Sequence, residues 1–283
     1  MDINENRNLK KIITLRNATW TQKNRFNKPF NDLYNECQSE DQLWIVSKLI
    51  EEFNFIDSSR FVDEVEKMGD CIQKTWMLNP KDTIITAICD SSKPDGSQSV
   101  IRTLETCLPV TWKNSIHNNI NEAFHKPNQN IVLVDDFAGT GKKVYERIIR
   151  LMHHLKTNDY ESNVYLVVLA GMEDGLDILE KALNGKSFCS IKMSKAISEN
   201  ISCSKEKARA IDAMIELEQR ILLPTPYPKE ERFMEYNFGF LLSEAIFFVE
   251  ALNVPNNVFP IFWKERGYNN GKQITRDPIF RRR

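Results

Sequence analysis

Two adjacent aspartates followed by a glycine-rich turn are the residues of this sequence best suited to chemistry. They lie in "NIVLVDDFAGTGKKVYERI", residues 130–148, where four apolar residues precede Asp135 and Asp136. Adjacent carboxylates can accept hydrogen bonds from a vicinal diol, such as the 2′- and 3′-hydroxyls of ribose, or approach Mg²⁺. The turn at residues 137–142 presents backbone N–H groups at the start of the next helix, which favours a phosphate. The stretch therefore predicts a site for a phosphorylated sugar.

An ATP-binding loop is the alternative interpretation of the same stretch. A Walker A loop requires the pattern G-x-x-x-x-G-K-[ST]. With Gly141 and Lys142 in register, the first glycine position holds Asp136 and the final Ser/Thr position holds Lys143. A carboxylate among phosphate-binding amides would repel the ligand, so these departures argue against a P-loop ATPase.

The flanking sequence predicts the elements that position this motif. Four apolar, β-branched runs indicate buried strands, at residues 82–90, 130–136, 162–171 and 187–193. Amphipathic stretches at 142–155 and 174–185 indicate helices between them. Strands that alternate with helices predict an α/β, Rossmann-like fold with a mostly parallel sheet and right-handed crossovers. Ligands bind at the carboxyl ends of such strands, where the polar loops after Asp90 and Asp136 both fall.

Three segments are expected along the chain: an N-terminal helical extension (1–80), the α/β core (81–195) and a helical C-terminal cap (196–283). In the extension, Ser39 is a candidate N-cap with Gln42 at the capping-box position. In the cap, the apolar run at residues 238–252 predicts a buried helix, and Phe259, Phe262 and Trp263 indicate a compact core. The tail is either a basic patch for an acidic partner or a solvated terminus, through Arg276, Arg281, Arg282 and Arg283.

Composition favours a soluble protein of the reducing cytoplasm. The 283 residues are 41% hydrophobic with a formal net charge of -1, which gives no global attraction to nucleic acid or to an anionic membrane. The first residues contain no apolar signal region, and no stretch reaches the roughly 18 apolar residues of a membrane span. The six cysteines form no CxxC pair and no zinc-like cluster.

The motif "IVLVDDFAGTGKK" resembles the PRPP-binding motif of type I phosphoribosyltransferases. The resemblance implies that Asp135 and Asp136 hold the ribose and Mg²⁺. It also implies a 5-phosphate site formed by Ala138, Gly139, Thr140, Gly141 and Lys142, with Lys143 replacing the usual threonine by a second charge.

In that family, pyrophosphate is held by a loop after the first core strand. Here the corresponding loop is "DSSKPDGSQS", which implies a pyrophosphate site at Ser91, Ser92, Lys93, Gly96 and Ser97. The alternative is a plain surface turn, because KPDG is favourable turn chemistry by itself.

Most of the chain resembles a narrower group, the phosphoribosyltransferase-like proteins of bacterial conflict and antiphage systems, including retrons. The segments that carry this resemblance are "FNKPFNDLYNECQSEDQLWIVSKLIEEF", "DDFAGTGK" and "ALNVPNNVFPIFW". It implies an effector whose partners are a reverse transcriptase and its RNA-linked single-stranded DNA. Self-association into a homo-oligomer is left open.

Two functions therefore remain. The first is an enzyme that binds PRPP or a related ribose 5-phosphate with Mg²⁺ and transfers or cleaves at the anomeric carbon. The second is a catalytically inactive module that senses PRPP or a nucleotide, or docks onto a nucleoprotein. Lys143 and the lack of an evident catalytic base favour the module, and release of pyrophosphate separates the two.

Overall fold

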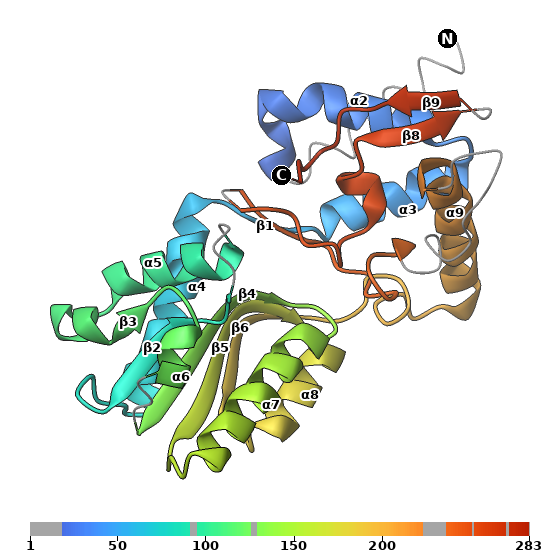
Figure 1. The fold of residues 1–283 in the computed structure, drawn as a ribbon. Coiled ribbons are helices and arrows are strands. Elements are labelled where there is room, and N and C mark those ends of the chain that lie inside the picture. Colours follow the sequence, from blue (N-terminus) through green and yellow to red (C-terminus); the bar gives the residue numbers. More distant parts are fainter. Residues whose placement is uncertain are drawn as a thin grey trace. The chain divides into compact units, whose positions relative to one another are not determined.

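The computed structural model describes residues 19–90, 95–125, 129–222, 236–250, 252–269 and 272–282. The chain forms two compact units (Figure 1). We call Asp57–Ser194 the core unit, and Met1–Ile56 with Lys195–Arg283 the flanking unit. This grouping differs from the three expected segments, since residues 57–80 belong with the core and the first 56 residues belong with the C-terminal part.

The core unit alternates helices and strands from its first helix to its last strand. In chain order its elements are α4 (Ser58–Asp70), the π-helical turn η3 (Cys71–Thr75), β2 (Thr83–Ala87), α5 (Gly96–Cys107), the 3-10 turn η4 (Val110–Ser115), β3 (Ile116–His117), α6 (Asn121–His125), β4 (Asn130–Ala138), α7 (Lys142–Thr157), β5 (Asn163–Met172), α8 (Glu173–Ala182) and β6 (Ser187–Met193).

These strands form one five-stranded sheet in the order β3-β2-β4-β5-β6. Every neighbouring pair is parallel, which confirms the predicted α/β fold with a mostly parallel sheet. The four predicted strands are β2, β4, β5 and β6, and the two-residue β3 was not predicted. β2 is buried at all five of its positions, as expected for a strand covered on both faces.

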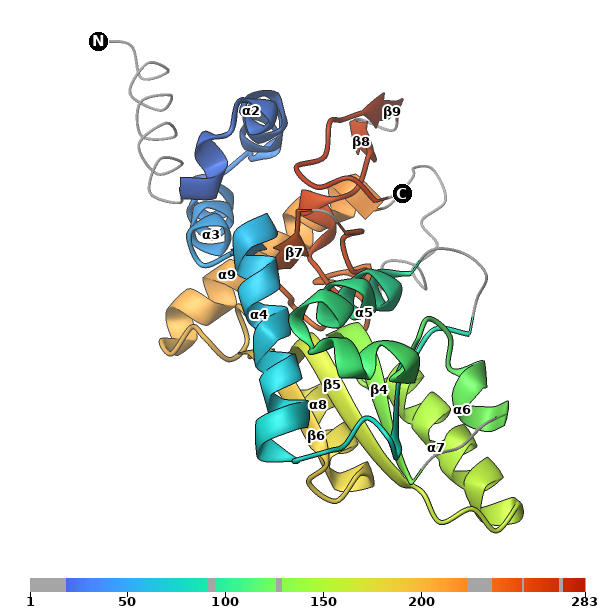
Figure 2. The ribbon, with the colours of Figure 1, turned by 90° about the vertical axis from the view of Figure 1, so that its left-hand side faces the viewer.

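Helices cover both faces of the sheet. α4 and α5 pack together on one face, and α6, α7 and α8 pack together on the other (Figures 1 and 2). Ile131 and Leu133 of β4 join Ile148 and Leu151 of α7 in a single apolar cluster. Val132 and Val134 alternate with them and point to the opposite face, where β4 contacts α5.

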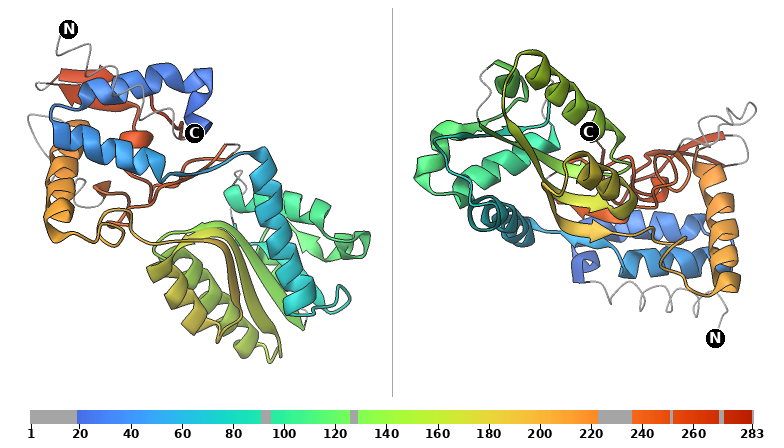
Figure 3. Two further views of the ribbon diagram at one scale, coloured as in Figure 1. Left: turned by 180° about the vertical axis from the view of Figure 1, so that it is seen from behind. Right: turned by 90° about the horizontal axis from the view of Figure 1, so that it is seen from below.

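α4 belongs to the core unit and lies beside the sheet (Figure 3, left), where it contacts α5, β5 and β6. Phe61, Val65 and Met68 recur at helical spacing and are buried. Glu64 on the same side accepts hydrogen bonds from Lys67 and from Ser190 of β6, at 2.8 and 2.6 Å. A predicted boundary at residue 80 therefore cuts a helix from the sheet that it covers.

The flanking unit combines both ends of the sequence. Its elements are the 3-10 turns η1 (Thr19–Gln22) and η2 (Asn24–Phe26), α2 (Asn27–Glu36), α3 (Glu40–Glu51), β1 (Asn54–Ile56), α9 (Ser204–Leu222), β7 (Phe247–Val249), the 3-10 turn η5 (Pro260–Phe262), β8 (Arg266–Asn269) and β9 (Lys272–Thr275). α3 packs against α9, and β1 pairs in parallel with β7. None of the described helices is long and apolar enough to cross a membrane.

The predicted N-cap of α3 is confirmed. The Ser39 hydroxyl accepts a hydrogen bond from the Gln42 amide at 3.2 Å, and the Gln42 side chain accepts one from the Gln38 amide at 2.8 Å. The predicted apolar core of the C-terminal segment is also confirmed, because Phe259, Phe262 and Trp263 are buried.

Arg276 is a buried structural residue, so the predicted basic patch at the tail is wrong for this position. Its guanidinium pairs with Glu36 at 2.8 Å and donates to the Lys264 and Ile261 carbonyls. These bonds hold the C-terminal segment onto α2 and leave no free charge for a partner. Arg281 is exposed, Arg282 lies over the Trp263 ring, and Arg283 falls outside the described residues.

Residues 238–252 do not form the predicted helix. Phe238, Leu241, Leu242 and Glu244 have positive φ angles of 50–57°, and Phe247–Val249 form strand β7. Hydrogen bonds to residues 256 and 257 fix the irregular part: Phe240 N donates to the Asn256 carbonyl, and Ser243 Oγ donates to the Asn257 carbonyl. Tertiary pairing with β1 and with this turn overrides the apolar helical pattern.

Glu218 of α9 is a fully buried carboxyl beside this irregular segment. One of its oxygens accepts the Phe238 amide at 2.6 Å, and the other has no partner among the described residues. Burial, helped by the negative charge of Glu244, raises the pKa of Glu218 from 4.5 to about 8. The folded protein therefore keeps a proton on Glu218 at neutral pH, where the unfolded chain has released it.

We expect Glu218→Gln to flatten the pH dependence of stability. The raised pKa gives stability that is complete below about pH 4.5 and is lost towards pH 8. The loss is about 1.4 kcal/mol per pH unit in that window. Denaturant unfolding at pH 5, 6, 7 and 8 measures this slope. Glu206→Gln, an exposed change on the same helix, is the matched control, and equal slopes for all three proteins would contradict the assignment.

Candidate ligand site at the β2–β4 junction

The order of the strands creates one switch point in the sheet. β2 is the first strand of the sheet in sequence; the chain then adds β3 on one side of it and β4 on the other. The helices after β2 and β4, which are α5 and α7, consequently lie on opposite faces. In open α/β sheets, ligands bind outside the carboxyl ends of the strands at such a point. Both loops that the sequence analysis singled out end here.

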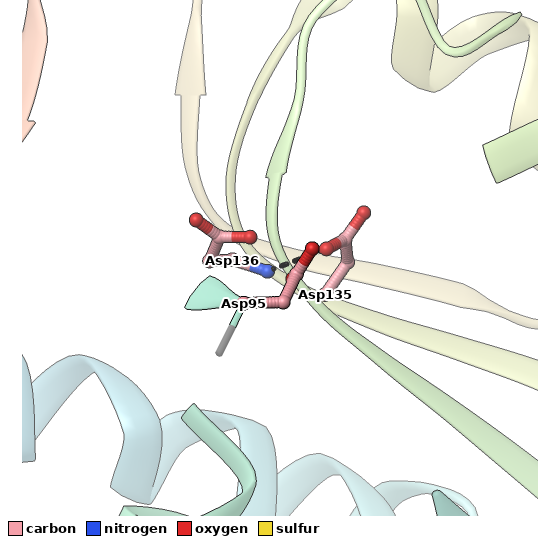
Figure 4. A group of neighbouring side chains, drawn as sticks. All are labelled: Asp95, Asp135 and Asp136. Carbon is pink, nitrogen blue, oxygen red and sulfur yellow. Dashed lines mark hydrogen bonds between the residues drawn. The ribbon is translucent and has the colours of Figure 1, made fainter. Parts of the chain in front are cut away.

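Three aspartates meet at this junction (Figure 4). Asp135 and Asp136 lie in the last part of β4, beyond its last pairing with β2, which joins Ala87 and Val134. Asp95 precedes α5 and points toward them from the other loop. Carboxylate oxygens of the three residues all lie within 4.8 Å of one another. Asp135 is 5% exposed, and its Oδ1 accepts the Asp136 amide at 3.0 Å.

The close carboxylates and their surroundings shift the three pKa values in different directions. Burial, and then the charge of Asp136, raises the pKa of Asp135 well above its usual value. Burial, and then the charge of Asp95, raises the pKa of Asp136. Burial also acts on Asp95, but hydrogen bonds from Ser97 and the charges of Lys143 and Arg147 lower the pKa of Asp95 overall. The cluster thus holds Asp95 ionised and leaves excess negative charge for a cation or hydroxyl donors to relieve.

Gly96 allows the two loops to approach each other. A Cβ atom added at Gly96 would lie 2.0 Å from Oδ2 of Asp136, far inside contact distance. The Asp95 carboxylate caps α5 by accepting the Ser97 amide at 3.0 Å and the Ser97 hydroxyl at 2.9 Å. Asp95 was not predicted from the sequence as a site residue, although Asp95 and Gln98 have the spacing of a capping box, which the structure contains.

The turn between β4 and α7 is arranged as an anion site. β4 continues to Ala138, so the turn itself consists of Gly139, Thr140 and Gly141. Gly141 precedes α7 with φ 71° and has no side chain to cap the helix. Gly141 therefore offers no side-chain acceptor to the first N–H groups of α7. The helix dipole favours an anion beside these groups. Lys142 and Lys143 of the first turn are both exposed.

A basic flank of α7 faces both ends of the loop that follows β2. Lys143 Nζ lies 3.7 Å from Asp95 Oδ2, and Arg147, one turn later, bonds Asp90 at 2.6 Å. Arg150 approaches the other Asp90 oxygen at 3.2 Å. Nη1 of Arg147 is buried without a partner among the described residues. The sequence analysis also missed Arg147, whose spacing of four residues from Lys143 was the available signal.

The predicted pyrophosphate residues are only partly placed. Ser91, Ser92 and Lys93 lie outside the described residues. Gly96 and Ser97 are not in a loop, because they form the first turn of α5. Ser97 is fully buried, and its hydroxyl donates a hydrogen bond to Asp95. Its observed role is therefore structural. The predicted ribose and phosphate residues, Asp135 to Lys143, are contiguous at the junction.

The family of the chain follows from its sequence once this fold and site are in view. Residues 25–282 match the PRTase-CE family. The match takes in both units, and the chain therefore belongs to the PRTase-CE family of phosphoribosyltransferase-like proteins. No curated protein matches the sequence.

Two solved structures are similar to parts of the chain. One is hypoxanthine-guanine phosphoribosyltransferase from Schistosoma mansoni in complex with IMP, at 16% identity and a TM-score of 0.33; the similarity covers 49% of this chain and 65% of that one. The chain thus spans just under two thirds of that enzyme. The other is the AQ2163 protein from Aquifex aeolicus, at 9% identity and a TM-score of 0.32, covering 58% of this chain and 83% of that one.

We expect Gly96→Ala to disturb this junction selectively. The added methyl group must displace the Asp136 carboxylate, and overpacking of this kind costs about 1–3 kcal/mol of unfolding free energy. Gly69→Ala in α4 is the matched control, because its Cβ would meet Leu104 of the neighbouring helix α5 at an ordinary contact distance of 3.4 Å. Thermal unfolding of both variants measures the difference. A Gly96→Ala protein as stable as Gly69→Ala would show that the two loops are not held this closely.

Proposed function

We propose that this protein binds PRPP, or a related ribose 5-phosphate, at the β2–β4 junction and transfers or cleaves at the anomeric carbon. The observation that carries the proposal is that Asp135 and Asp136 are separated from the start of α7 only by the short turn at residues 139–141, and that no side chain at Gly141 caps this helix. Carboxylates that suit hydroxyl groups thereby adjoin amides that suit a phosphate. Membership of the PRTase-CE family supports the same class of ligand.

Each element of the site would bind a different part of the ligand. Asp135 and Asp136 would accept hydrogen bonds from the ribose 2′- and 3′-hydroxyls. The backbone of Ala138 to Gly141, the Thr140 hydroxyl and the charges of Lys142 and Lys143 would hold the 5-phosphate at the α7 dipole. For the leaving pyrophosphate we retain the sequence-based proposal of Ser91, Ser92 and Lys93, together with Gly96 at the start of α5; Ser97 is already bonded to Asp95.

The three aspartates fit a bound Mg²⁺. Their oxygens are hard ligands gathered within 4.8 Å, and Mg²⁺ prefers carboxylate and phosphate oxygens. The raised pKa values of Asp135 and Asp136, which come first from burial and then from neighbouring carboxylates, are the expected consequence of a cation site without its counter-charge. We propose Asp135 and Asp136 as ligands, joined by Asp95. When bound, the ion would neutralise charge on the pyrophosphate as it departs.

The reaction would be a displacement at C1 of the ribose. The bond from C1 to the pyrophosphate oxygen breaks, and its electron pair leaves with pyrophosphate. A nitrogen nucleophile, or water in a cleavage reaction, forms the new bond to C1 and gives up a proton. The chain contributes mainly by position and charge: the aspartates orient the ribose, and the α7 start fixes the phosphate so that C1 faces the acceptor.

The second candidate is a binding module without catalysis. It is favoured by Lys143, which replaces the threonine usual in the resembled motif and lies 3.7 Å from Asp95 instead of offering a hydroxyl to a phosphate. Such a module would sense PRPP or a nucleotide, or would dock onto a nucleoprotein. Continuous assay of pyrophosphate release, with a panel of bases and nucleotides as acceptors, separates it from an enzyme.

For the cellular role we propose an effector of an antiphage system of the retron type, acting in the cytoplasm. The support is the resemblance of three separated segments of the chain to such proteins. A reverse transcriptase with its RNA-linked single-stranded DNA would be the restraining partner. Growth of cells that express the chain alone, compared with cells that also express those partners, tests this role; equal growth would contradict it.

We expect calorimetric titration of PRPP with Mg²⁺ to show binding by the wild type and at least a hundredfold weaker binding by Asp135→Asn/Asp136→Asn. Each amide keeps one acceptor oxygen where the carboxylate has two, and it carries no negative charge to balance a cation. Asp63→Asn, an exposed change on α4, is the control and should bind like the wild type.

The double variant should also unfold at an equal or higher temperature than the wild type. Both pKa values are raised, so the ionised cluster costs stability at neutral pH, and amides remove that cost. A well-folded wild type that binds neither PRPP nor ribose 5-phosphate would refute the ligand assignment.

A further inference from the structure

Lys143 lies between the two parts of the proposed site. Its backbone belongs to the first turn of α7, next to the turn at residues 139–141 that would hold the 5-phosphate. Its Nζ lies 3.7 Å from Oδ2 of Asp95, one of the three aspartates that fit Mg²⁺. One positive charge is therefore within reach of a phosphate on one side and of the metal cluster on the other.

The charge of Lys143 acts on all three carboxylates of the cluster. Burial is the largest influence on the pKa values of Asp135 and Asp136 and raises both, while Lys143 acts in the lowering direction at each. Burial also acts to raise the pKa of Asp95, which the hydrogen bonds from Ser97 and the charge of Lys143 lower overall. Lys143 is thus a counter-ion of the whole cluster and not of Asp95 alone.

The contact between Lys143 and Asp95 is loose on the lysine side only. The Lys143 side chain is 64% exposed, and 3.7 Å is longer than a direct hydrogen bond. Asp95, by contrast, accepts the Ser97 amide at 3.0 Å and the Ser97 hydroxyl at 2.9 Å. A lysine ammonium is a compact charge on a flexible four-carbon stem. The aspartate is therefore fixed, and the lysine is the partner that can turn to another anion.

We propose that Lys143 is a tethered cation that makes the metal site depend on the phosphate ligand. Without a ligand, its ammonium group partly neutralises the cluster and lowers the affinity for Mg²⁺. A 5-phosphate bound at the start of α7 attracts the same ammonium group away from Asp95 and leaves this carboxylate to the ion. This role rests on the proposed function, because it needs a phosphate and a divalent cation at the places assigned above.

The size of the effect follows from the charges. A divalent ion and an ammonium group roughly 6 Å apart in a solvated site repel each other enough to lower the affinity about three- to tenfold, allowing for salt screening. The threonine usual at this position of the resembled motif carries no charge and has no such effect. Lys143 thus gives this chain a property that the usual motif residue would not.

The two ligands must then favour each other. Because the phosphate compound removes Lys143 from the cluster, it raises the affinity for Mg²⁺, and by linkage Mg²⁺ raises the affinity for the phosphate compound by the same factor. Ribose 5-phosphate is the suitable probe, because it carries the 5-phosphate and lacks the pyrophosphate that would itself coordinate the ion.

Calorimetric titration of Mg²⁺ into the full chain, without any phosphate compound, is the first test. Lys143→Met should bind Mg²⁺ about three- to tenfold more tightly than the wild type, and Lys143→Arg, which keeps the charge, should bind it like the wild type. Lys142→Met is the matched control, since it removes one exposed charge from the same turn, and it too should bind Mg²⁺ like the wild type. Circular dichroism should show all three variants folded, because both lysines are exposed.

The second test repeats the Mg²⁺ titration in saturating ribose 5-phosphate. The wild type should gain at least about threefold in Mg²⁺ affinity, and Lys143→Met should gain less. Equal gains in both proteins would overturn the proposal. So would Lys143→Met binding Mg²⁺ no more tightly than the wild type in the first titration, or no Mg²⁺ binding by either protein. A wild type that binds no ribose 5-phosphate would refute the ligand assignment instead, and the first titration would still decide whether Lys143 opposes the metal.

Discussion

The convergence of three carboxylates at one point of the sheet is the constraint around which the core unit is arranged. Like charges within 4.8 Å repel. The neighbouring residues must therefore leave space for the carboxylates or compensate their negative charge. Gly96 leaves space for the Asp136 carboxylate because it has no Cβ atom. Ser97 and Lys143 offset the charge of Asp95. A structural unit would gain stability by replacing these aspartates, so their presence argues that the junction exists to bind a ligand.

The sequence was sufficient to predict the parts of this arrangement that depend on local pattern. Buried parallel strands are continuous apolar runs, and β2, β4, β5 and β6 were recognised as such. The motif at residues 135–143 was placed correctly at a strand end because the change from apolar strand to polar turn is abrupt. Ser39 was identified from its side-chain chemistry, which acts within four residues. Each of these features needs no information from distant parts of the chain.

The features that were missed depend on distant contacts. β3 has two residues and is a strand only because Ile116 and His117 pair with β2. Phe247–Val249 form a strand because β1, almost two hundred residues earlier, provides the partner. Arg276 was expected at the surface, yet Glu36 and two carbonyl groups make its burial favourable. Asp95 became a site residue only when the sheet brought its loop to β4.

α7 shows how one helix can serve separate purposes without conflict. Its N-terminus follows the turn at Gly141, and its basic flank forms ion pairs with Asp90 and Asp95. Its buried flank places Ile148 and Leu151 in the core. The helical period of 3.6 residues places Tyr145, Ile149 and Met152 on a further flank, where these side chains are exposed.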